Sequence, residues 1–236
     1  MAITLYAISL AKRSVYNVEE NFLYIPTFLM GRLLWRVHFT NEAPTELQSG
    51  GVLVANHRSS VDPFFVQLSA GRRVHWMVAK EYCNHFAFGP LLKLCQVIPT
   101  NRSGMDTAST KAAIRMTREG RLVGMFPEGR LNKTDDALLS FRSGAAVVAE
   151  KAGVPIIPLW IEGSPYRQTV WSPVTMPAHV RITFGAPIPT KTEELQGHGD
   201  SRADELMLEW GQQLVRISGK ANQQIQLSAR RKRKRS

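Results

Sequence analysis

The chain has little cysteine and no long apolar run. Only two cysteines, Cys83 and Cys95, occur among 236 residues, too few for a disulfide framework, a thiolate zinc site or an iron–sulfur cluster. Their scarcity favours a reducing compartment, and no metal site is expected. No stretch reaches the ~18 consecutive apolar residues of a membrane-spanning helix. A cleaved signal peptide is not expected either, because no basic residues precede the uncharged N-terminal stretch.

Acidic residues are also scarce relative to basic ones. The chain holds 19 Asp and Glu against 30 Lys and Arg, a net charge of +11. Six of the positive charges lie in the last seven residues, "RRKRKRS", and the remaining excess still suits a lipid surface, a phosphorylated substrate or a nucleic acid. The tail lacks interleaved aromatic residues and the body shows no nucleic-acid motif, so no specific nucleic acid is expected. A solvated tail without a partner is the plainer alternative.

Residues 1–40 are predicted to form a separate N-terminal helical segment. Pro26 is expected to interrupt it, with a helix over 28–38 after the proline and Trp35 on its flank. The apolar residues at helical spacing in this stretch are Met30, Leu33, Leu34 and Val37. A basic amphipathic helix of this kind either lies in a lipid interface or packs on its own domain, and the pattern leaves both open.

Residues 41–218 alternate between strand-like and helix-like segments, which predicts a single α/β domain. Its central sheet is expected to be largely parallel and flanked by helices. The expected strands are 52–55, 74–79, 122–126, 156–161 and 180–184, and the expected helices are 63–70, 86–94, 107–119, 142–152 and 202–218. Asp106 and Gly153 are typical residues to begin and end helices. Residues 219–236 are interpreted as a linker and a disordered basic tail.

The stretch "VLVANHRSSVD" places His57 directly after an apolar strand and Asp62 five residues later. Loops at strand ends are where α/β proteins usually carry functional groups. Asp62 has two interpretations at this point. It can orient the imidazole, it can cap the next helix with Pro63 behind it, and one carboxylate can do both.

A second strand-end loop, "MFPEGR", carries Glu128, Gly129 and Arg130. Glycine permits a positive φ or the close approach of a ligand to the backbone, and the planar guanidinium of arginine suits phosphate. Lys80 and Arg102 follow two further apolar runs. Each residue alone is consistent with plain surface, but together these loops are expected to converge at one edge of a parallel sheet.

Four blocks in this order resemble one known family. "NHRSSVD" is similar to its NHxxxxD block, "VIPTNRSG" to a block ending in arginine, "FPEGR" to FPEGTRS, and "GVPIIPLWI" to VPIxP. Over residues 40–190 the chain therefore resembles the glycerophospholipid acyltransferases, whose best-known members are the 1-acylglycerol-3-phosphate acyltransferases. One position departs from the pattern, because Arg130 follows Gly129 where the family has threonine and then arginine.

The resemblance implies transfer of a fatty acyl group from acyl-CoA or acyl-carrier protein to the hydroxyl of a lysophospholipid, without a cofactor. His57 would be the general base and Asp62 its carboxylate partner. The implied substrate-binding residues are Lys80, Arg102, Glu128, Gly129 and Arg130. The lipid substrates imply a membrane lipid surface as partner, with the protein peripheral or monotopic on the cytoplasmic face.

Three alternatives stay open from the sequence. The departure at Arg130 allows another hydroxyl or an amine as the acceptor. Ser59 and Ser60 lie near enough to His57 for a covalent route, although no GxSxG elbow occurs and "EGSP" around Ser164 does not match one. A basic nucleic-acid-binding protein or a membrane scaffold without catalysis is the alternative from another class.

Overall fold

The computed structural model describes residue 16 and residues 18–86, 88–101, 106–166, 169, 171–190, 200–220 and 222–228. These residues form a seven-stranded sheet in the order β1-β7-β6-β2-β5-β3-β4. The strands are β1 (His38–Phe39), β2 (Gly51–Ala55), β3 (Val74–Ala79), β4 (Ile98–Thr100), β5 (Leu122–Met125), β6 (Ile156–Glu162) and β7 (Arg181–Phe184). The five strands from β6 to β4 are mutually parallel. Only β7 and β1 run the other way, so the predicted largely parallel sheet is confirmed.

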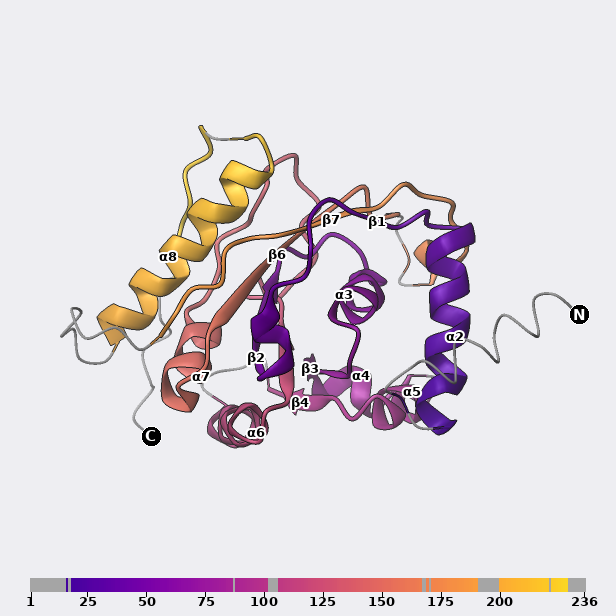
Figure 1. The fold of residues 1–236 in the computed structure, drawn as a ribbon, viewed down its shortest axis with the longest axis horizontal. Coiled ribbons are helices and arrows are strands. Elements are labelled where there is room, and N and C mark those ends of the chain that lie inside the picture. Colours follow the sequence, from indigo (N-terminus) through magenta and orange to yellow (C-terminus); the bar gives the residue numbers. More distant parts are fainter. Residues whose placement is uncertain are drawn as a thin grey trace, which may run out of the picture.

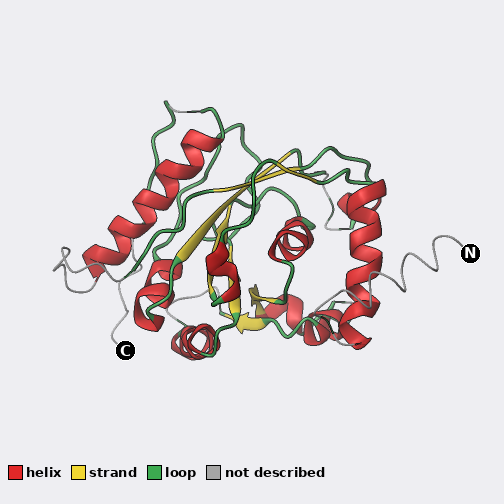
Figure 2. Cartoon of the chain, viewed as in Figure 1, coloured by secondary structure: helices red, strands yellow, loops and turns green. Residues whose placement is uncertain are grey.

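Helices cover both faces of this sheet (Figures 1 and 2). They are α2 (Val18–Leu33), α3 (Asp62–Ala70), α4 (Lys80–Cys83), α5 (Gly89–Leu94), α6 (Thr107–Arg118), α7 (Gly144–Ala152) and α8 (Asp200–Ile217), with 3-10 turns η1 (Thr45–Gln48) and η2 (Ser172–Thr175). Successive residues of β2 point to opposite faces. Val52 and Val54 join the core under α6, α7 and α8, whereas Leu53 and Ala55 join the core under α2 and α3.

The predicted helix boundaries hold closely where the sequence supplies a cap. Asp106 accepts a hydrogen bond from the backbone N–H of Ser109 at 3.1 Å and begins α6. Gly153 ends α7 with a φ of 71°, a left-handed conformation that glycine adopts without steric cost. The very short strands β1 and β4 were not predicted, because two or three residues carry no period for a pattern to reveal.

The prediction for the N-terminal helix was wrong in its bounds. Helix α2 begins at Val18 and passes through Pro26, which costs one internal hydrogen bond but does not end the helix. The helix ends at Leu33, and Arg36 then takes a φ of 42° and turns the chain. Helical spacing therefore does not predict which side chains are buried near the end of α2. Leu33 is 73% exposed, whereas Trp35, which was expected on the flank of the helix, is 1% exposed and lies in the core.

Residues 222–228 lie against the loop that follows β5. The backbone N–H of Phe141 donates to the carbonyl of Gln226 at 3.1 Å, and the backbone N–H of Ser228 donates to the carbonyl of Phe141 at 2.8 Å. Gln223 donates to the carbonyl of Leu138 at 2.7 Å. This strap, residues 222–228, is thus ordered by main-chain pairing, whereas the basic tail 230–236 lies outside the described residues.

None of the described helices combines the length and the apolar character that crossing a membrane would require.

Candidate functional site

The predicted site residues that can be described gather at the carboxyl edge of the parallel strands. β2 ends at Ala55 and leads to His57, and its neighbour β5 ends at Met125 and leads to Glu128. On the other side of β2, β6 ends at Glu162 and leads to Ser164. Because parallel strands end at one edge, three segments far apart in sequence supply one site.

The carboxylate of Asp62 is completely buried and faces His57. Its Oδ2 lies 3.1 Å from the Nδ1 of His57 and accepts the backbone N–H groups of Arg58 and Ser59, each at 2.7 Å. Its Oδ1 accepts the hydroxyl of Ser164 at 2.6 Å. Four donors therefore compensate the burial of the carboxylate and fix its position.

The interpretation of Asp62 as a helix cap was wrong. Helix α3 starts at Asp62 itself, its N-cap is Val61, and no side-chain cap bond is formed. The carboxylate turns back toward residues 57–59 instead of toward the N–H groups of its own helix.

The hydrogen bond to Asp62 sets the tautomer of the His57 ring. A carboxylate only accepts, so Nδ1 carries the proton and Nε2 keeps its lone pair. Among the described residues Nε2 has no partner, and the His57 side chain is 18% exposed. The ring stacks on Phe126 at 3.9 Å between centroids, and Phe126 stacks on Trp76 at 4.6 Å. Phe126, backed by Trp76, thus fixes the plane of the imidazole, and no described residue bonds to its basic nitrogen.

Glu128 connects the loop after β5 to the backbone of the histidine. Its Oε1 accepts the N–H of His57 at 2.9 Å, and its Oε2 accepts the N–H of Leu139 at 2.8 Å. Burial raises the pKa of Glu128 to about 7, although the two backbone N–H donors oppose that rise. The carboxyl group is buried and joins the loop after β2 to the loop after β5 through these two hydrogen bonds.

The remaining predicted binding residues have plainer surroundings. Gly129 takes a φ of +66° with open space where a side chain would be, which is the first of the two uses that the sequence left open for it. Arg130 is exposed beside it. Lys80 is exposed at the first position of α4, directly after β3. Arg102 lies outside the described residues, so its convergence with the other cations stays a prediction.

Sequence reasoning missed four residues that build this site. Ser164 was judged only against a nucleophile motif, and its position directly after β6 was the available signal. Phe126 and Trp76 were treated as strand residues, and nothing in the sequence distinguishes a stacking ring from a core ring. Arg58 donates to the carbonyls of Thr134 and Asp136, at 2.6 and 3.0 Å, a link between loops that no spacing reveals.

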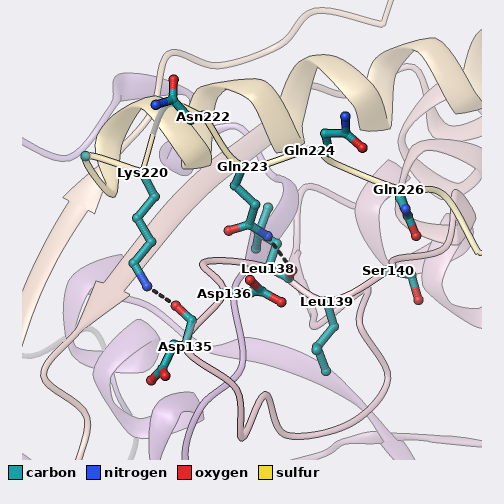
Figure 3. Close-up of a pocket in the computed structure, with 11 residues that line it drawn as sticks. Asp135, Asp136, Leu138, Leu139, Ser140, Lys220, Asn222, Gln223, Gln224 and Gln226 are labelled. Atoms are coloured by element: carbon teal, nitrogen blue, oxygen red, sulfur yellow. Dashed lines mark hydrogen bonds between the residues drawn. The ribbon is translucent and has the colours of Figure 1, made fainter.

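A cavity of about 610 Å³ lies away from His57, between the loop after β5 and the strap (Figure 3). Its lining is Asp135, Asp136, Leu138, Leu139, Ser140, Gly219, Lys220, Asn222, Gln223, Gln224 and Gln226. Figure 3 shows Lys220 bonded to the carbonyl of Asp135 and Gln223 bonded to that of Leu138. This lining holds two aspartates, one lysine and several amides but no histidine.

The described residues contain no group of three or more metal-ligating side chains. The chemical capacity of the site lies in a histidine–carboxylate pair whose second imidazole nitrogen has no partner among the described residues. Such a pair removes a proton from a hydroxyl, as the base of a direct transfer or hydrolysis does. The molecule is thus an α/β protein whose strand-end edge is equipped for general-base chemistry.

Comparison with known proteins places that chemistry in a family. The sequence pattern of the family described as "Acyltransferase" matches residues 36–162, more than half of the chain. The chain therefore belongs to the acyltransferase family, and the predicted kinship with glycerophospholipid acyltransferases is confirmed.

Three curated relatives are named 1-acyl-sn-glycerol-3-phosphate acyltransferases. The Bacillus subtilis protein is 29% identical over 152 residues, covering 63% of this chain and 72% of its own length. The Streptococcus pneumoniae protein is 27% identical, covering 69% and 62%, and the human beta protein is 32% identical, covering 62% and 53%. The chain thus spans about half to three quarters of these relatives.

The fold has a solved counterpart in the 1-acyl-sn-glycerophosphate (LPA) acyltransferase PlsC of Thermotoga maritima. The TM-score is 0.62 at 18% identity, over 92% of this chain and 95% of that one. At this identity the likeness establishes the shared α/β fold.

Proposed function

We propose that this protein acylates 1-acylglycerol-3-phosphate to phosphatidic acid, with acyl-CoA or acyl-carrier protein as donor. The single observation that carries the proposal is the bond of His57 Nδ1 to a buried, four-donor Asp62, with Nε2 left without a partner among the described residues. The family and the names of its curated relatives support the acyl group and the acceptor.

The reaction is a direct transfer. Nε2 of His57 takes the proton of the acceptor hydroxyl while the oxygen attacks the thioester carbonyl carbon. The tetrahedral intermediate collapses, the carbon–sulfur bond breaks, and the thiolate leaves with the proton returned by the imidazolium. Asp62 holds the ring orientation and stabilises the transient imidazolium charge. General-base catalysis of this kind contributes typically ~10²–10⁴-fold, and positioning of the two substrates supplies more.

We assign the phosphate of the acceptor to the exposed cations that follow the strands. Arg130 follows β5, the neighbour of β2, and Lys80 follows β3, one strand further on; both are exposed. Arg102 belongs to this set by sequence. A covalent route through Ser59 is disfavoured because that side chain is fully buried and its hydroxyl accepts from the N–H of Val61. The departure at Arg130 keeps another hydroxyl or an amine acceptor as the second candidate. The lipid acceptor implies a peripheral place on a membrane, which we propose to be the cytoplasmic face.

The test is transfer of a radiolabelled acyl group from acyl-CoA to a panel of lysophospholipids. We expect 1-acylglycerol-3-phosphate to be the best acceptor, and His57→Ala to lower turnover by at least ~10²-fold without unfolding the protein. His38→Ala, an exposed histidine on β1, is the matched control. Turnover like that of the wild type in His57→Ala would refute the general-base role.

The phosphate assignment has its own measurement. Lys80→Ala should raise the KM for the lysophospholipid more than the KM for acyl-CoA, since we assign the charge of Lys80 to the acceptor's phosphate and not to the phosphates of CoA. Lys111→Ala, an exposed lysine on α6, should change neither. Equal effects of Lys80→Ala on both substrates would count against phosphate recognition at this position.

A further inference from the structure

One surface of the protein exposes aromatic side chains to water. Phe86 is 89% exposed, Trp171 is 54% exposed and Tyr82 is 38% exposed. Phe88 joins them, because its ring stacks on Trp171 at 4.3 Å and meets the edge of Tyr82 at 6.2 Å. We name these residues, with His85 stacked on Phe86 at 4.9 Å, the aromatic surface.

This surface is depleted of charge in a strongly basic protein. Residues 82–92, "YCNHFAFGPLL", contain no charged side chain, and neither do residues 171–178, "WSPVTMPA". Charged side chains border the first stretch: Lys80 and Glu81 precede it and Lys93 follows it, and all three are exposed. An apolar centre with charges only at its margin differs from ordinary surface, where exposed apolar residues occur singly.

The aromatic surface begins at the same edge of the sheet as the candidate site, because α4 directly follows the carboxyl end of β3. From Ser164, which bonds to Asp62, the chain leads past Tyr166 to Trp171. The Nζ of Lys133 lies 5.8 Å from the Tyr166 ring centroid, over its face. Helix α4, which carries Tyr82, directly follows the strand of Trp76, whose ring belongs to the stack on His57. In Figure 1, α4 and α5 lie next to each other along the lower edge of the molecule.

We propose that the aromatic surface is the face that enters the interfacial layer of a lipid bilayer, beside the mouth of the His57 site. The inference rests on the proposed function, since an acceptor held in a bilayer must reach His57. Tryptophan and tyrosine favour the membrane–water interface, because each ring has an apolar body and a polar tip. Bordering lysines add attraction to anionic headgroups. An acidic carrier protein would require cations at the centre of the surface instead.

The chain carries its own probe of this contact. Of its five tryptophans, Trp35, Trp76, Trp160 and Trp210 are each at most 7% exposed, whereas Trp171 is 54% exposed. With vesicles of equal parts phosphatidylcholine and phosphatidylglycerol, we expect the emission of the protein to shift to the blue. Lipids brominated near the headgroup end of the acyl chain should quench it. Trp171→Phe should abolish both responses while the protein still sediments with the vesicles.

A second variant tests the binding energy of the surface. Phe86→Ser should weaken sedimentation with these vesicles by about tenfold or more, since burial of a phenylalanine ring is lost. Phe39→Ser, which removes a 41% exposed phenylalanine on β1, should leave it unchanged. Equal weakening by both variants would overturn the assignment.

The outcomes separate this inference from the proposed function. Wild-type turnover of a short-chain, water-soluble lysophosphatidic acid without vesicles tests the function alone. If that turnover is present but Trp171 emission does not respond to bound vesicles, the basic tail or α2 makes the contact and the aromatic surface is not the docking face. A blue shift that grows with protein concentration in the absence of lipid would instead assign the surface to a second copy of the chain and overturn the proposal.

Discussion

Replacing Glu128 with glutamine should change how the stability of the protein depends on pH. In the wild type, two backbone N–H groups, from His57 and Leu139, converge on the two carboxylate oxygens. Glutamine keeps the shape but offers one accepting oxygen and one NH2 group. One buried N–H therefore loses its acceptor in Glu128→Gln, at a cost of about 1–3 kcal/mol that does not depend on pH.

The pH-dependent part follows from the pKa of Glu128, which burial raises from 4.5 to about 7. A raised folded-state pKa means that the fold favours the protonated carboxyl. The contribution of the protonated Glu128 carboxyl to stability is complete below pH 4.5 and is lost as the pH rises through about 7. One pKa unit corresponds to about 1.4 kcal/mol, so the wild type should lose up to about 3 kcal/mol relative to the variant across this window.

Urea unfolding of both proteins, at pH values from about 5 to about 8, measures this difference. We expect the stability advantage of the wild type over Glu128→Gln to be largest at the acidic end, to shrink up to about pH 7 and then to level off, since only the wild type titrates at this position. A constant difference across the range would refute the argument. The carboxyl would then keep one protonation state throughout, and burial would not govern its proton affinity.

Two further substitutions test the packing around His57. Ser164→Ala removes the 2.6 Å hydrogen bond to Asp62. Hydrogen bonds to charged groups are worth about 1.5–3 kcal/mol, so stability and kcat should both fall. Ser164→Thr keeps the hydroxyl and should restore kcat. Failure of threonine to restore it would show that the serine's size, and not its hydroxyl, matters. Gly124→Ala places a Cβ 2.8 Å from the Trp76 ring and should cost about 1–3 kcal/mol in chemical unfolding. An unchanged unfolding midpoint in Gly124→Ala would mean that β5 and the Trp76 ring move apart without a cost in stability.

Much of the sheet could be predicted because its strands are continuous apolar runs. Strand β2, with every residue buried, reads as such a run, since helices cover both of its faces. The pairing of His57 with Asp62 could also be predicted, because both residues belong to one short loop and one recognised block.

What could not be predicted depends on strand order. Ser164 lies 102 residues from Asp62 in sequence, and the two meet only because β6 is the neighbour of β2 in the sheet. The burial of Trp35 depends on a single turn at Arg36. A helical period cannot indicate that turn, because the period assumes that the helix continues.

The strap links the C-terminal region to His57 through the loop that follows β5. Residues 222–228 pair with Phe141, and nearby in the same loop Leu139 bonds to Glu128, which in turn bonds to the backbone of His57. Anyone who fuses a reporter to this protein or trims its C-terminal residues should therefore keep residue 228 and everything before it. A cut at 221 would release a loop that is two hydrogen bonds from the backbone of His57, although no severed residue touches the histidine itself.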